Sequence, residues 1–131
     1  MTKIKNFEEL ESWKIAYQLG LSVYRLSLKP PIVQDYGLCN QVRRSSVSIT
    51  SNIAEGFERN GDREFIQFLS IAKGSCGELR SQLYLLKDLE YINNEDFEVL
   101  QEMCIKTGKL LSGLMRYLAK SDPKGWKFKE L

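Results

Sequence analysis

Residues 62–91 read DREFIQFLSIAKGSCGELRSQLYLLKDLEY, and no other stretch of the chain says more about its architecture. Apolar residues recur there every three or four positions, which places them on one face of an amphipathic α-helix. The repeat is close to a heptad and favours packing against other helices at a shallow left-handed crossing angle. We therefore predict a core helix, capped by Asp62, whose inner face holds Phe65, Phe68, Leu69, Ala72, Cys76, Leu79, Leu83 and Leu86.

Three further segments have helical periodicity, and the residues between them stop helices: a proline pair at 30–31, an Asn-Gly pair at 60–61 and an Asn-Asn pair at 93–94. Connections of only a few residues make successive helices antiparallel neighbours. The sequence thus predicts an all-α fold, an up-down-up-down antiparallel four-helix bundle. It forms one domain over residues 1–131, with helices at about 7–28, 36–58, 62–91 and 95–120 and a short tail at 121–131.

The first helix begins with a capping-box pattern, because Asn6 is followed three positions later by Glu9. Trp13, Tyr17 and Tyr24 recur at helical spacing, beside smaller apolar residues. We expect these aromatic side chains to face the core. An exposed aromatic patch at Trp13 and Tyr17 is the alternative.

Composition argues against an enzyme. The chain contains no histidine, which removes the commonest general base and zinc ligand. Its three cysteines are far apart, so we expect them buried and reduced rather than paired or bound to a cofactor or metal. No apolar run approaches the roughly 20 residues of a membrane span, and we expect a cytoplasmic protein without a signal peptide or membrane anchor. The net charge of +2 does not indicate a nucleic-acid binder, so any basic surface must be local.

A polar tract lies inside the second helix. Residues 43–52 read RRSSVSITSN, and such Ser, Thr and Asn side chains are poor helix formers. Small side chains allow a neighbouring helix to approach closely, and the third helix has small residues of its own at Gly74, Ser75 and Gly77. The tract therefore predicts close packing, either between the second and third helices or between subunits.

Basic residues form a stripe on the third helix. Lys73, Arg80 and Lys87 are seven positions apart, with Gly77 and Tyr84 between them. Stacked cations beside an aromatic ring can follow a phosphate backbone. The alternative is that these long side chains only cover the edge of the apolar face. The fourth helix carries Lys106, Lys109, Arg116 and Lys120. Complementarity to the helix dipole explains these residues, and a binding role is the alternative.

Three glutamates, Glu55, Glu64 and Glu78, offer carboxylates for a metal site. Di-metal bundles add a histidine to each such motif, and this chain has none. Ion pairs with Arg43, Arg44 or Arg59 are the better explanation.

The run QVRRSSVSITSNIAEGFER at residues 41–59 resembles the signature of the four-helix-bundle proteins encoded in intervening sequences of bacterial large-subunit rRNA genes. EFIQFLSIAKGS at residues 64–75 and the opening Phe7-Glu8-Glu9-Leu10 agree with that family. The resemblance covers about residues 6–120. Departures are mild, with Ser45-Ser46 in place of alanines and Thr50 where a proline often lies.

This resemblance implies a homopentamer around a central channel. A related branch, the accessory variability determinant proteins of diversity-generating retroelements, is partnered by a reverse transcriptase and binds nucleic acid through basic residues. By that implication Arg43, Arg44, Lys73 and Arg80 form a basic surface, which the helical stripe extends to Lys87. Glu55, Arg59 and Glu78 become candidates for a structural charge network.

The resulting prediction is a non-enzymatic, homo-oligomeric accessory protein that contacts RNA or DNA, beside a reverse transcriptase or ribosomal RNA. The alternative, favoured by the small net charge, is an oligomeric scaffold that binds only protein.

Overall fold

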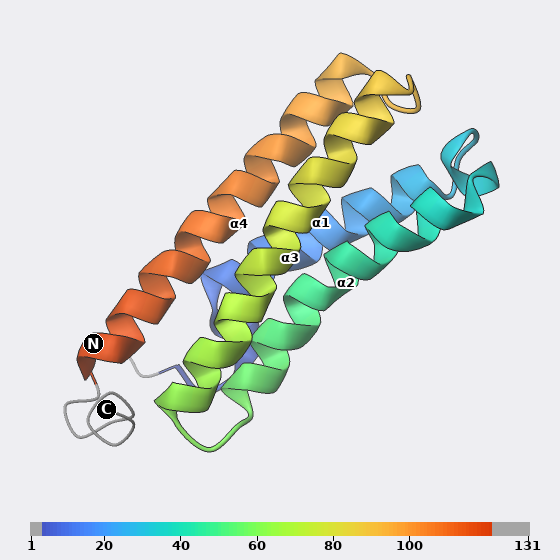
Figure 1. Cartoon of the computed structure of the whole chain (residues 1–131). Helices are drawn as coiled ribbons and strands as arrows, with labels where there is room; N and C mark the ends of the chain where they lie inside the picture. Colours follow the sequence, from blue (N-terminus) through green and yellow to red (C-terminus); the bar gives the residue numbers. More distant parts are fainter. Residues whose placement is uncertain (1–3, 122–131) are drawn as a thin grey trace.

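The computed structural model describes residues 4–121 and confirms the all-α prediction (Figure 1). Among the described residues there is no strand. Four long helices and two short 3-10 helices follow one another in the order η1 Phe7–Glu9, α1 Glu11–Ser27, η2 Ile32–Gln34, α2 Tyr36–Phe57, α3 Asp62–Asp88 and α4 Asn94–Ser121. In residues 4–121 no helix combines the length and the apolar character that crossing a membrane requires.

The four helices form an antiparallel bundle. Each helix packs on the next one in the chain, and contacts between α1 and α4 close the arrangement. The α2–α3 pair has the most extensive contact, and α3 lies between α2 and α4 in Figure 1. The fully buried centre includes Leu19 of α1, Ile49 of α2, Leu79 of α3 and Leu111 of α4. One core therefore joins all four helices, as the heptad-like pattern predicts.

The first helix begins later than its capping pattern predicts. The Asn6 backbone N–H does donate to the Glu9 carboxylate at 3.1 Å. This contact closes the 3-10 turn η1, because Leu10 has an extended backbone (φ −73°, ψ 128°) that separates η1 from α1. The capping box therefore organises a lead-in turn, and α1 starts at Glu11.

The other helix starts have identifiable caps. Asp35 accepts a hydrogen bond from the Leu38 N–H at 3.2 Å, and its second carboxylate oxygen accepts one from the Tyr91 hydroxyl at 3.0 Å. One side chain thus caps α2 and joins its start to the α3–α4 connection. Asn93 caps α4 by accepting from the Asp96 N–H at 2.7 Å.

The prediction that Asp62 caps the third helix is wrong by one position. The cap is Gly61, whose φ of 128° lies in a region that L side chains rarely adopt, and Asp62 is the first residue of α3. At the other end of α3, Glu90 has a φ of 63°. Its N–H donates to the Lys87 carbonyl, and the Tyr91 N–H donates to the Leu86 carbonyl, which is the Schellman arrangement that closes a helix.

Two of the aromatic residues expected in the core are exposed. Tyr17 keeps 44% and Tyr24 41% of its surface accessible, while Trp13 is half-buried and stacks on Tyr17 at 5.0 Å between ring centroids. The buried face of α1 consists of smaller residues: Ser12, Ala16, Leu19, Val23 and Ser27. Small side chains allow α1 to lie close to its neighbours, so the bulky rings occupy the rim of that face.

Part of the polar tract packs against α3 within the subunit. Ser45 and Ser46 are buried, and the Ser48 hydroxyl is 2.8 Å from the Ser75 hydroxyl across the α2–α3 contact. Gly56, at the end of the same face, lies against α3 so closely that a β-carbon there would meet the Phe68 Cβ at 2.6 Å. Ser48 and Gly56 of α2 thus serve the α2–α3 contact, whereas Ser46 lines a hollow beside α1.

Candidate nucleic-acid interface

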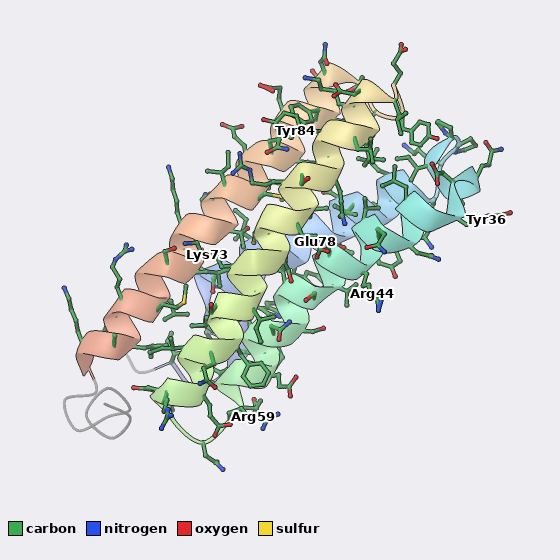
Figure 2. The ribbon with its side chains drawn as sticks, in the orientation of Figure 1. Tyr36, Arg44, Arg59, Lys73, Glu78 and Tyr84 are labelled. Carbon is green, nitrogen blue, oxygen red and sulfur yellow. The ribbon has the colours of Figure 1, made fainter. Side chains whose placement is uncertain are left out.

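The basic stripe of α3 lies on the side of that helix next to α4. Figure 2 shows Lys73 and Tyr84 on this side and Glu78 on the side toward α2. Seven-residue spacing on a helix repeats after almost two full turns, so Lys73, Arg80 and Lys87 share one line along α3. This geometry is the one that the sequence predicts for α3. Basic residues of α4 join those of α3 only in the folded bundle.

A groove of about 570 Å³ runs between α3 and α4, with basic residues from both helices. Lys73 and Arg80 come from α3, and Lys109 and Arg116 come from α4. No acidic side chain is among the described residues that line it. We call this feature the basic groove. It is lined by Lys73, Cys76, Gly77, Arg80, Cys104, Ile105, Gly108, Lys109, Ser112 and Arg116.

A buried glutamine holds Arg80 in place. Gln101 of α4 is 7% exposed, and its Oε1 accepts a hydrogen bond from Arg80 Nε at 3.0 Å. Its Nε2 donates to the Arg80 backbone carbonyl at 2.8 Å. Only Nε of the guanidinium is used in these contacts, so the two terminal nitrogens can serve a ligand in the groove. Gln101 is a positioning residue that helical periodicity does not reveal, because a polar residue on the inner face reads as a break in the apolar pattern.

Lys87 is engaged at the end of the stripe. Its Nζ lies 4.5 Å from the ring centroid of Phe97 and 5.9 Å from that of Tyr84, and the two rings pack edge-to-face at 5.0 Å. A cation over aromatic faces is attracted by the ring quadrupole. Lys87 therefore helps to join α3 and α4, and it is not among the residues that line the basic groove.

Arg43 and Arg44 lie away from the basic groove. Arg43 donates from Nε to the Ser27 hydroxyl at 2.7 Å and from Nη2 to the Ser27 carbonyl at 3.2 Å, and its guanidinium lies over the Tyr24 ring at 5.0 Å. Arg43 of α2 thus binds the last residue of α1. Arg44 is exposed on α2, and Figure 2 places it across α3 from Lys73. The structure does not bring these two arginines together with Lys73 and Arg80.

The charge network contains two of its three predicted members. Arg59 pairs with Glu55 at 2.7 Å and with Glu64 at 3.6 Å, and its guanidinium lies over the Phe68 ring at 5.0 Å. The hydrogen bond that Arg59 donates to the Glu55 carboxylate is the main reason that the pKa of Arg59 is raised. Glu78 is exposed and forms no ion pair within the described part of the chain. Glu64 takes its place, because the α2–α3 turn brings it next to Arg59.

Two of the three cysteines lie under the basic groove. Cys76 and Cys104 are 3% and 1% exposed, and burial raises the pKa of each thiol to about 12. Cys39 is also buried and unpaired. The prediction that the thiols are buried is confirmed. Among residues 4–121, no three His, Cys, Asp or Glu side chains are grouped so that they could hold a metal ion.

The sequence profile of one protein family, described as "23S rRNA-intervening sequence protein", matches residues 8–113. The chain belongs to this family. A solved structure similar to it is that of a protein of unknown function from the S23 ribosomal protein family of Bacteroides thetaiotaomicron. The two share 24% identity with a TM-score of 0.73, over 79% of this chain and 97% of the other, and at that identity the likeness shows the fold alone. No curated protein matches the chain.

Membership of the 23S rRNA-intervening sequence protein family confirms the resemblance based on residues 41–59 and 64–75. Those two segments meet in the structure. They contain Gly56 and Ser48 of α2, which pack against Phe68 and Ser75 of α3. The most recognisable part of the sequence is therefore the α2–α3 contact, whereas the basic groove lies on the opposite side of α3.

Proposed function

We propose that this member of the 23S rRNA-intervening sequence protein family is a non-enzymatic, homo-oligomeric accessory protein that contacts RNA or DNA through the basic groove. The observation that supports this most is the convergence of Lys73 and Arg80 with Lys109 and Arg116 on one groove without an acidic lining residue. Local concentration of one sign of charge in a concave site attracts a polyanion even when the net charge is small.

Phosphate contact is the interaction that these side chains provide. Lysine and arginine neutralise phosphates and release condensed counterions, so affinity falls steeply with salt. Arginine can also hold a phosphate through two parallel hydrogen bonds, and Gln101 leaves both terminal nitrogens of Arg80 for that purpose. The sequence contributes the rest of the argument for a non-enzymatic role, since it offers no histidine.

The test is salt-dependent binding of a labelled RNA, compared among three proteins. Four phosphate contacts predict a slope of log K against log salt of about −3 to −4, and a Lys73→Ala/Arg80→Ala variant should lose about half of that slope. Arg25→Ala/Lys29→Ala is the matched control, because it removes the same charge from exposed positions of α1 and its end. Equal affinity of the two double variants would reject the basic groove as the binding surface.

Self-association is the second part of the proposal, and the resemblance implies five copies. The face of α1 and α2 opposite the core supports it, because Tyr17, Tyr24 and Val47 are each more than 40% exposed around a hollow of about 170 Å³. Exposed apolar area of this kind is typical of protein–protein contacts. Light scattering behind size exclusion tests it: we expect a mass of several chains, and a Tyr17→Glu/Val47→Glu variant should shift the mass toward one chain.

The protein-only scaffold remains the alternative, and the same aromatic face favours it. It predicts the oligomer without any retention of nucleic acid. A reverse transcriptase or ribosomal RNA as the partner follows from the family resemblance alone. Co-purification from the native host, with and without nuclease treatment, tests both.

A further inference from the structure

We infer that the basic groove admits a single strand of nucleic acid between α3 and α4, and that Gly77 and Gly108 leave the room for it. The inference rests on the proposed function and specifies that the ligand is single-stranded. A duplex, by contrast, would touch only the rims of the groove.

The arrangement of the four cations is the first observation. Arg80 lies opposite Gln101, and Tyr84 lies opposite Phe97, which sets the register of the antiparallel pair. In that register Lys73 and Lys109 lie at about the same level on opposite walls. Arg80 is about 10 Å away toward one end and Arg116 a similar distance toward the other, at 1.5 Å per residue. The four cations thus extend over roughly 20 Å along the groove, with two on each wall.

The narrowness of any groove between two packed helices is the second argument. Packed helices are about 8–10 Å apart between axes, whereas the major groove of a B-form duplex alone is about 12 Å wide. A duplex is therefore too wide to enter the groove along the α3–α4 seam and would rest on its rims. A single phosphodiester chain is narrow enough to lie between walls that carry cations on both sides.

The third observation is the open space above two glycines inside helices. A β-carbon built at Gly77 or at Gly108 meets no atom within 4 Å, so neither glycine is needed for helix packing. Each costs about 0.5–1 kcal/mol relative to alanine in a helix interior. Both line the basic groove, where their missing side chains deepen it and allow a ligand backbone to approach.

An aromatic ring lies beyond one end of the four cations. Tyr84 is one helical turn from Arg80 on the same face of α3, and 48% of it is exposed. Its ring is held edge-to-face against Phe97 at 5.0 Å. Single-strand sites combine a basic track with rings on which bases stack, and Tyr84 has the exposure and the position for this.

The experiment fills the groove without changing its charge. In Gly77→Leu/Gly108→Leu, the β-carbon at each position meets no atom within 4 Å and leucine has the better helix propensity, so the variant should be at least as stable as wild type. Gly74→Leu is the matched control: it lies on the same helix, has open space above it and does not line the groove. Binding is measured by fluorescence anisotropy with a uridine oligonucleotide, the DNA oligonucleotide of the same sequence and an RNA duplex.

We expect wild type to prefer either single strand to the duplex, and the filled variant to lose roughly tenfold or more in single-strand affinity while duplex binding stays the same. Gly74→Leu should bind like wild type. Single-strand affinity that survives the filling, or a duplex bound as tightly as a single strand by wild type, would overturn the inference while leaving phosphate contact intact. Wild-type protein that binds no probe at low salt would overturn the proposed function as well. A difference between the RNA and DNA strands identifies which of the two the groove takes.

Discussion

Gly56 offers a sharp test of the α2–α3 contact, because alanine there should destabilise the protein although alanine favours helices. The new β-carbon would lie 2.6 Å from the Phe68 Cβ and 3.0 Å from the Phe65 Cδ1. Carbon atoms in contact are about 3.5–4.0 Å apart, so the overlap is roughly 0.9 Å. A Cβ atom is fixed to its backbone and cannot rotate away, so α2 and α3 must separate.

The magnitude follows from two opposing effects. Overpacking of a core costs about 1–3 kcal/mol, and the fixed Cβ–Cβ overlap places this site at the upper end. The gain in helix propensity on replacing glycine with alanine returns about 1 kcal/mol. The free energy of unfolding should therefore fall by about 2 kcal/mol in Gly56→Ala.

The assay is urea denaturation followed by far-UV circular dichroism. With a slope of about 2 kcal/mol per molar urea, the midpoint should fall by roughly 1 M. Gly74→Ala is the control, since its β-carbon meets nothing within 4 Å and only the propensity gain applies. Its midpoint should rise by roughly 0.5 M. A Gly56→Ala midpoint at or above that of wild type would refute the close approach of α2 and α3 at this position.

Three further predictions concern single contacts. Glu90→Gly should raise the free energy of unfolding by about 0.5–1 kcal/mol, because φ of 63° strains any residue with a β-carbon; a loss of stability would contradict the left-handed backbone there. Arg43→Lys should lower the free energy of unfolding by about 1–2 kcal/mol, because an ammonium lacks the planar Nε and Nη2 fork that makes both bonds to Ser27, and unchanged urea denaturation would show these bonds to be unimportant. The hydrogen bond to Asp35 raises the pKa of Tyr91 above its usual value of 10.0, so this contact stabilises the fold below pH 10 and is lost as the pH rises through the raised pKa. Tyr91→Phe should accordingly unfold at lower urea than wild type at neutral pH, with a gap that closes in alkaline buffer; a gap independent of pH would place the effect elsewhere.

Much of the bundle follows from local pattern. The heptad-like spacing of α3, the breaks at Pro30-Pro31 and Asn60-Gly61, and the capping box of Asn6 and Glu9 act within a few residues of the chain. Such features predict where helices begin and end to within a few positions. The errors at η1 and at Asp62 concern single turns, which compete with helix over one or two residues.

Which side chains of each helix are buried depends less on the local sequence. Tyr17 and Tyr24 continue the apolar stripe of α1, yet they remain exposed because smaller residues allow α1 to pack more closely. Sequence periodicity gives only the direction of the apolar face around the helix axis. How deep a side chain lies depends on the neighbouring helix, which sequence spacing does not describe.

The candidate site depends most on tertiary structure. Sequence spacing placed Lys73, Arg80 and Lys87 in one stripe, and that stripe exists. The register of α3 against α4 then adds Lys109 and Arg116 to Lys73 and Arg80, while contacts with Ser27 keep Arg43 elsewhere. Residues within one helix are related by a fixed 1.5 Å rise, so their common face can be read from the chain. The relative position of cations on two helices depends on how the side chains of those helices pack. Only the tertiary structure decides this register.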